Sequence, residues 1–286
     1  MSQGSLFEPQ SVIRAEVRDA IERLDFAAAG RRLKQFRRLW PEAELTWEPE
    51  LIRIGAEWTG RPLDLDSGYG VWGKLESRLG PLGVPRSRTA SIRRHFFSRL
   101  LAASRRLFEE LHTPAGRSLG DFYLLAEQPN NARRLYEREV RQLGDGWELR
   151  LGLGHCNFRL GHRGAAHSNY HWSFLLGLPE ESWERIEDPE FLARLREVED
   201  PEWAFPDVCA AGDLPAARFS TRREFEQFKS RFTVALTESP APRRFCLYWI
   251  VSENKPFCTE RELLEARRQM KALNPRLHAR YMQRLE

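Results

Sequence analysis

Apolar residues recur along most of this chain with the three- and four-residue spacing of one helix face. Between residues 11 and 24, for example, Ile13, Val17 and Ile21 lie one turn apart, and the residues between them are mainly polar or small. The same pattern predicts further helices over residues 26–40, 87–111, 221–236 and 259–285. Asn274-Pro275 is expected to kink or divide the last of these, because proline cannot continue the hydrogen-bond ladder of a helix.

Patterns typical of β-strands are scarce. The apolar run 245–251 (FCLYWIV) is the one serious candidate, and it is equally compatible with a buried helical turn because it is short and apolar throughout. Two segments rich in Gly, Pro and Asp, residues 59–69 and 199–215, are predicted to be loops. The sequence therefore predicts an all-α fold.

The strongest signal is a self-match at a spacing of 34 residues. The matched residues are Leu119 and Leu153, Gly120 and Gly154, Ala132 and Ala166, and Tyr136 and Tyr170. This period is that of a helix–turn–helix unit that buries its apolar face by stacking on its neighbours. The glycines and alanines would let adjacent helices approach closely, and the tyrosines would fill the space between one pair and the next.

These residues resemble the tetratricopeptide repeat (TPR) family, whose units carry Leu-Gly on the first helix, Ala and an aromatic residue on the second, and a closing proline. The resemblance is best over residues 113–146 and 147–179, and residues 26–41 look like the second helix of another unit. Glu127 departs from the family pattern, which has glycine in the helical turn. The resemblance implies stacked antiparallel helical hairpins that form a TPR-like α-solenoid.

The predicted organisation has three parts. Residues 1–8 are expected to form a flexible N-terminus, and residues 9–179 a helical-repeat domain. Residues 180–286 combine an acidic loop region with C-terminal helices, which either continue the same stack or form a small irregular cap.

In the TPR family, the first helix of each unit lines a concave face that holds an extended peptide or a partner helix. Carried over to this sequence, the groove would present Arg117, Asp121, His155, Phe158 and Arg159. Arg117 and Arg159 would suit a carboxylate. The resemblance thus implies a protein–protein interaction adaptor or assembly factor. The competing interpretation is that these residues are ordinary helix surface.

The overall charge is nearly balanced, with 45 Lys and Arg against 41 Asp and Glu, but two segments are strongly biased. Residues 86–106 hold seven Arg and no acid, and residues 180–213 hold twelve acids and three Arg. A predicted basic patch consists of Arg94, Arg99, Arg105 and Arg106. It is typical of a nucleic-acid surface, or of a solvated face that complements the acidic segment within the chain or across a self-associated pair. The small net charge favours the second interpretation.

Residues 155–171 hold four of the seven histidines. His167 and His171 are four residues apart and would share a helix face, which is a spacing that metal sites use. Together with His155 they are the candidate ligands of a metal-dependent enzyme. No carboxylate lies within the stretch, however, and the repeat register points these histidines in different directions. We therefore expect surface or boundary histidines and no metal.

No motif predicts catalysis or cofactor binding. Residues 68–74 match GxGxxG followed by Lys, but the strand before it and the acidic residue after it that a dinucleotide site needs are missing. A turn that opens into a short aromatic helix is the favoured interpretation. The chain is expected not to be an enzyme and to need no cofactor.

The four cysteines show no CxxC pairing, and the first ten residues are polar. No apolar run approaches the ~20 residues that span a bilayer. These features predict a cytoplasmic protein without a membrane anchor, whose reduced thiols serve as small core residues.

Overall fold

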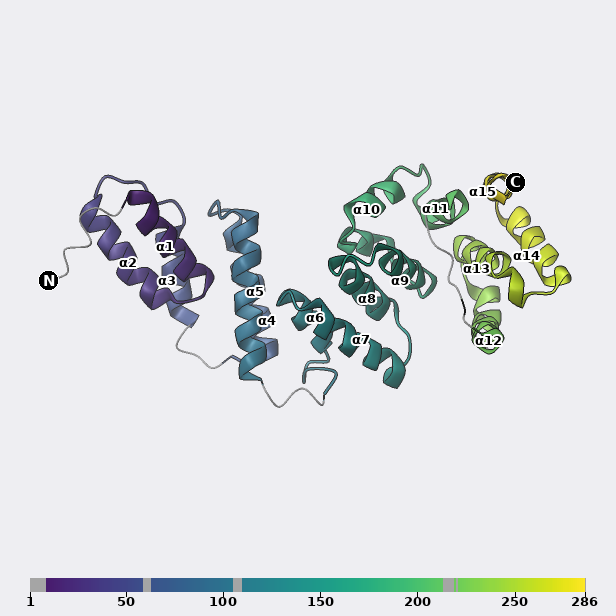
Figure 1. Ribbon diagram of the computed structural model, residues 1–286, viewed down its shortest axis with the longest axis horizontal. Helices are drawn as coiled ribbons and strands as arrows, with labels where there is room; N and C mark the ends of the chain where they lie inside the picture. The colour runs from purple at the N-terminus through teal and green to yellow at the C-terminus, as the bar shows by residue number, and fades with distance from the viewer. Residues whose placement is uncertain (1–8, 59–62, 105–109, 213–218, 220, 286) are drawn as a thin grey trace. The chain divides into compact units, whose positions relative to one another are not determined.

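The computed structural model describes residues 9–58, 63–104, 110–212, 219 and 221–285. Within these ranges every regular element is a helix and no strand is formed, so the prediction of an all-α fold is confirmed (Figure 1). The chain divides into two compact units, residues 1–132 and 133–286. This boundary falls inside a helix, whereas the sequence pattern ends the helical-repeat domain at residue 179. The predicted flexible residues 1–8 lie outside the described residues.

Unit 1 contains six helices within its described residues and the start of a seventh. They are α1 (Gln10–Glu22), α2 (Phe26–Leu39), α3 (Glu48–Trp58), α4 (Leu65–Leu79), α5 (Arg86–Ala103), α6 (Leu119–Leu125) and the beginning of α7 (Pro129–Leu143). The stripe predicted on α1 is buried, with Ile13, Val17 and Ile21 at 1% exposure or less. The helix predicted over residues 87–111 is observed as α5, which ends at Ala103, and residues 105–109 of this prediction lie outside the described residues.

The glycine-rich residues 68–74 lie within α4 rather than in a turn. Asp64 caps this helix, because its side chain accepts a hydrogen bond from the Ser67 N–H at 2.7 Å. The loop predicted over residues 59–69 therefore extends too far. Gly68 is buried where a Cβ would lie 3.0 Å from Cδ2 of Leu100, so this glycine serves helix packing.

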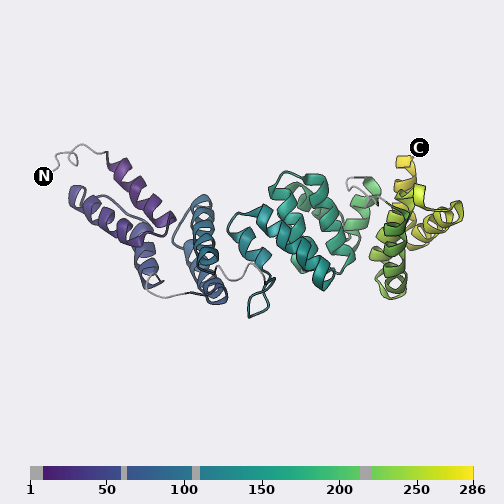
Figure 2. The same cartoon turned by 60° about the horizontal axis from the view of Figure 1, so that its bottom comes forward.

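Unit 2 contains the remainder of α7 and all later elements. These are α8 (Trp147–Arg159), α9 (Arg163–Leu175), η3 (Glu180–Arg185), α10 (Pro189–Arg196), η4 (Pro201–Trp203), α11 (Ala204–Ala211), α12 (Arg222–Glu238), α13 (Ala241–Glu253), η5 (Lys255–Phe257), α14 (Glu260–Leu273) and α15 (Pro275–Leu285). Helices α8 and α9 form an antiparallel hairpin and lie side by side in both views (Figures 1 and 2). One apolar core joins buried residues from α8 through α15.

The C-terminal half settles two points that the sequence leaves open and corrects a third. Residues 245–251 are helical and belong to α13, and Asn274 separates α14 from α15. The loop predicted over 199–215 is wrong for residues 201–211, which form η4 and α11. Pro206 is tolerated because it lies in the first turn of α11, where its missing N–H has no helical acceptor to lose. Gly212 ends the helix with a φ of +84°.

No helix among the described residues is both long and apolar enough to cross a membrane.

Candidate functional site

Two of the predicted groove residues of α8, His155 and Arg159, lie against the chain's own acidic segment. His155 is 9% exposed and lies against the ring of Tyr170, with the ring centroids 5.9 Å apart. Arg159 donates from Nε to Glu187 at 2.7 Å, and Phe158 is half-buried at the edge of the core. The charges of Glu187 and Arg185 also act on His155, so the acidic segment lies beside both His155 and Arg159.

Three carboxylates of this segment pair with three cationic or imidazole side chains of the α8–α9 hairpin. Besides the Arg159–Glu187 pair, Arg163 contacts Glu190 at 2.7 Å. His167 Nε2 donates to Asp188 Oδ2 at 2.9 Å. Further carboxylates of the acidic segment pair elsewhere in unit 2, in the pairs Arg194–Glu197, Arg196–Glu184 and Arg280–Asp207. Much of the charge of residues 180–213 is thus compensated within unit 2.

The predicted groove residues of unit 1 lie in a more open setting. Arg117 immediately precedes the N-cap of α6, and its guanidinium lies 4.2 Å from the centre of the Tyr69 ring. Its Nε is 3.8 Å from Asp66 Oδ1, and 47% of its side chain is exposed. Tyr69, on α4, is 36% exposed. Asp121 is exposed in the first turn of α6.

The described members of the predicted basic patch contact groups in unit 1. Arg94 pairs with Glu127 at 3.3 Å, and Arg99 donates to the Leu24 carbonyl at 3.1 Å. Arg105 and Arg106 lie outside the described residues.

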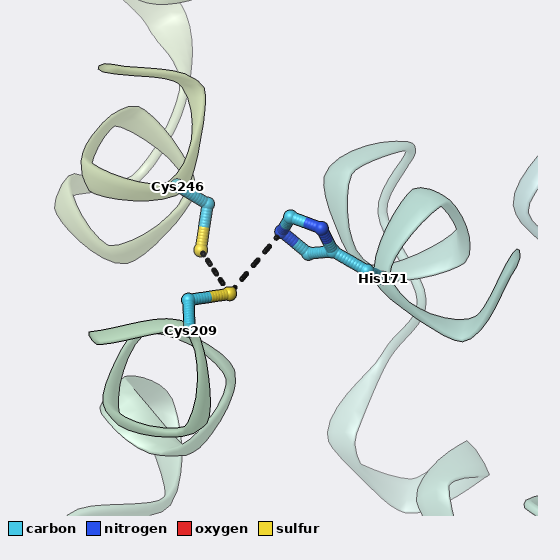
Figure 3. A group of neighbouring side chains, drawn as sticks. All are labelled: His171, Cys209 and Cys246. Atoms are coloured by element: carbon cyan, nitrogen blue, oxygen red, sulfur yellow. Dashed lines mark hydrogen bonds between the residues drawn. The ribbon is translucent and has the colours of Figure 1, made fainter. Parts of the chain in front are cut away.

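Of the three histidines named as metal candidates, only His171 joins a group of metal-ligating side chains among the described residues. His155 contacts Tyr170, and His167 stacks on Phe191 with ring centroids 4.9 Å apart. His171 instead meets two cysteines that the sequence pattern predicts to be core residues, Cys209 and Cys246 (Figure 3).

Three different helices supply this group, which we call the His–Cys–Cys cluster (His171, Cys209 and Cys246). His171 comes from α9, Cys209 from α11 and Cys246 from α13, and all three are buried. The Cys209 Sγ lies 3.6 Å from His171 Nε2 and 3.9 Å from the Cys246 Sγ. The donor atoms all lie within 4.8 Å of one another.

The surroundings of the cluster distinguish its two thiols. Burial raises the pKa of Cys246, but hydrogen bonds with Cys209 and His171 outweigh burial and bring this pKa to about 6. Burial and the neighbouring Cys246 raise the pKa of Cys209 well above its usual value. The rings of His171 and Trp249 meet in an edge-to-face arrangement, with the centroids 5.3 Å apart. Cys246 is therefore the more readily ionised thiol.

This arrangement limits the chemistry that the cluster can perform. All three side chains are at most 1% exposed, so an organic substrate has no access to the thiols. A small ion that reaches the cluster during folding or local opening would find two sulfur donors and one nitrogen donor. These donors suit soft or borderline metals.

The sequence contains no local signal for this cluster. Its ligands are 38 and 37 residues apart, which matches no metal-binding spacing motif. Cys209 lies on a helix within a segment whose prolines and glycine predict a loop. Only the tertiary packing of α9, α11 and α13 brings the donors together.

No protein-family model matches this chain, and neither the curated proteins nor the solved structures contain a match to it.

Proposed function

We propose that this chain is a protein–protein interaction adaptor or assembly factor, and that unit 1 carries its binding surface. The observation that carries the proposal is the stacking of the Arg117 guanidinium on the exposed ring of Tyr69. Tyr and Arg are enriched among the residues that contribute most to binding at protein interfaces. The resemblance of residues 113–146 to a TPR unit supports the same function, and Arg117 is one of the groove residues that this resemblance implies.

The surroundings of Tyr69 suit a binding surface that is formed before the partner arrives. The Tyr69 ring packs on Phe122 and Phe97, with centroids 5.9 Å and 6.4 Å away. Both of these phenylalanines are fully buried, so the tyrosine rests on a rigid base. Side chains that are ordered in advance lose less conformational entropy when they bind, which favours affinity.

The Tyr69 ring and Asp66 hold the Arg117 side chain in place, but they leave N–H groups of its guanidinium able to donate hydrogen bonds. Asp66, its ion-pair partner, also accepts hydrogen bonds from Thr113 Oγ1 at 2.7 Å and from the Ala115 N–H at 3.0 Å. The 3.8 Å separation between Arg117 and Asp66 exceeds hydrogen-bond distance. The guanidinium can therefore donate to a carboxylate of another protein while it stays on the ring. We infer that the partner presents an acidic peptide or helix.

Affinity capture with matched variants tests this proposal. We expect Arg117→Glu and Tyr69→Ala to lose a partner that the wild type retains after nuclease treatment. Arg37→Glu is the control, because Arg37 is an exposed arginine of α2 and its reversal changes the net charge equally. Capture of the same proteins by Arg117→Glu and wild type would exclude this surface, and loss on nuclease treatment would favour the nucleic-acid alternative.

We also propose a cytoplasmic location, which suits a chain whose four cysteines are free thiols.

A further inference from the structure

We propose that the His–Cys–Cys cluster of unit 2 binds a single thiophilic metal ion with a filled d shell, Zn²⁺ or Cu⁺, through His171, Cys209 and Cys246. This site is separate from the surface proposed at Tyr69 and Arg117, which belongs to unit 1. The proposal rests on the distances between the donor atoms, on their chemistry and on their burial.

The distances match those that one ion would impose. Bonds of about 2.3 Å to sulfur and about 2.0 Å to nitrogen at tetrahedral angles place two sulfurs about 3.8 Å apart, and a sulfur and a nitrogen about 3.5 Å apart. The corresponding separations are 3.9 Å between the thiols and 3.6 Å between Cys209 and His171. The third pair, His171 and Cys246, lies within 4.8 Å and would have to shorten when an ion binds.

The donor set selects the class of ion. Two thiolates and an imidazole are soft or borderline ligands, which favour Zn²⁺ and Cu⁺ over Mg²⁺ or Ca²⁺. The group contains no carboxylate among the described residues. Two thiolates carry a charge of about −2 when a metal has displaced both protons, and Zn²⁺ would neutralise it. Zn²⁺ is the expected occupant because an uncompensated charge in the core is costly.

The number of protein ligands, three, favours Cu⁺ as the alternative occupant. Zinc sites with three protein ligands complete their tetrahedron with a water or a substrate, whereas Cu⁺ is satisfied by few soft ligands. In either case the ion would join three helices whose ligands are 38 and 37 residues apart along the chain. Binding would therefore stabilise the folded state of unit 2, since the unfolded chain has no preformed site.

The alternative is a cluster of two thiols and an imidazole that packs in the core without an ion. Metal-binding measurements distinguish a metal site from a metal-free cluster. They use untagged, reduced full-length protein from which a chelator has removed any metal acquired during expression. Zn²⁺ and Cu⁺ would be titrated separately in competition with chromophoric chelators. Co²⁺ would be added as a spectroscopic probe, because thiolate ligands give it an intense near-ultraviolet charge-transfer band.

We expect about one ion per chain, a Co²⁺ spectrum with thiolate charge transfer, and a higher melting temperature with the ion bound. Cys209→Ala and Cys246→Ala should each weaken binding at least about 100-fold. Cys156→Ala is the matched control, since it removes another fully buried thiol, on α8, that lies outside the cluster. It should leave the affinity unchanged.

Absence of saturable binding of both ions would overturn the proposal, as would an equal loss of affinity in Cys156→Ala. If the cluster variants fail to fold, the wild-type Co²⁺ spectrum decides, because binding without thiolate charge transfer would place the ion elsewhere. One equivalent of Cu⁺ with no binding of Zn²⁺ would support the site and identify its occupant as the monovalent ion.

Discussion

The ring of Tyr170 occupies the space that a side chain on Gly154 would need. A Cβ built on Gly154 would lie 2.5 Å from Cδ1 of that ring, far closer than any real non-bonded carbon–carbon contact. Gly154 and Tyr170 both belong to the 34-residue self-match, so the repeat signal marks a close approach of α8 and α9. Tyr136, the counterpart of Tyr170 in the self-match, makes a similar contact between α7 and the α8–α9 hairpin. Its ring lies against Gly152 of α8, and a Cβ built on Gly152 would lie 2.6 Å from Cζ of Tyr136.

Substitution of Gly154 by alanine should destabilise the protein through this contact. The added methyl group must displace Tyr170, which is itself fully buried, and such overpacking costs about 1–3 kcal/mol. Chemical denaturation of the wild type and of Gly154→Ala measures the difference. Gly164→Ala is the control, because Gly164 also lies in a helix of the same hairpin and nothing comes within 4 Å of the position that its Cβ would take. It should be neutral or stabilising by up to about 1 kcal/mol, and equal destabilisation by both variants would contradict a role for the Tyr170 contact.

Local sequence patterns predict much of the helical structure, because helix formation and capping depend on neighbouring residues. The stripe of α1 and the break at Asn274 are both encoded within a few turns of chain. Local sequence does not predict the extent of α11. Pro206 and Gly212 occur near the ends of this short helix, but the same residues are equally typical of a loop.

The candidate sites depend on contacts between distant segments, which a single sequence does not reveal. The spacing of His167 and His171 indicates a shared helix face, yet their partners differ. His167 meets Asp188, and His171 meets Cys209 from α11. The resemblance places His155 and Arg159 in a groove, but it contains no information on the acidic segment that lies against them.

Asp188 should be essential for the stability of the contact between the acidic segment and the hairpin. This carboxylate is 1% exposed and caps α10, accepting hydrogen bonds from the N–H groups of Glu190 and Phe191 at 3.0 Å. Burial raises its pKa, but these bonds and the one from His167 together hold the pKa below its usual value. We expect Asp188→Ala to lower the free energy of unfolding by about 2–3 kcal/mol, since a cap and a charge-assisted hydrogen bond are lost together.

The control for this prediction is Asp200→Ala. Asp200 caps η4 through the Glu202 N–H at 3.2 Å, but this cap is exposed. Its removal should cost less than about 1 kcal/mol. Urea denaturation followed by circular dichroism compares the two variants, and a similar loss in both would show that burial and the His167 contact add nothing to the cap.

His155 should make the stability of unit 2 fall in mild acid. Burial lowers its pKa from 6.5 to about 4, and the positive charges of Arg159 and Arg185 add to this effect although Glu187 opposes it. The folded state thus keeps His155 neutral while the unfolded chain takes up a proton. The contribution of this residue to stability is full above pH 6.5 and is lost as the pH falls from 6.5 towards 4, by up to about 3 kcal/mol.

The difference between the wild type and His155→Phe isolates this effect from the titration of the carboxylates. The free energy of unfolding of the wild type should fall by about 2 kcal/mol more than that of the variant between about pH 7.5 and pH 5. His162→Gln provides the control, because it removes an exposed histidine from the turn between α8 and α9. Parallel curves for the wild type and His155→Phe would mean that the imidazole takes up its proton as readily in the folded protein as in the unfolded chain.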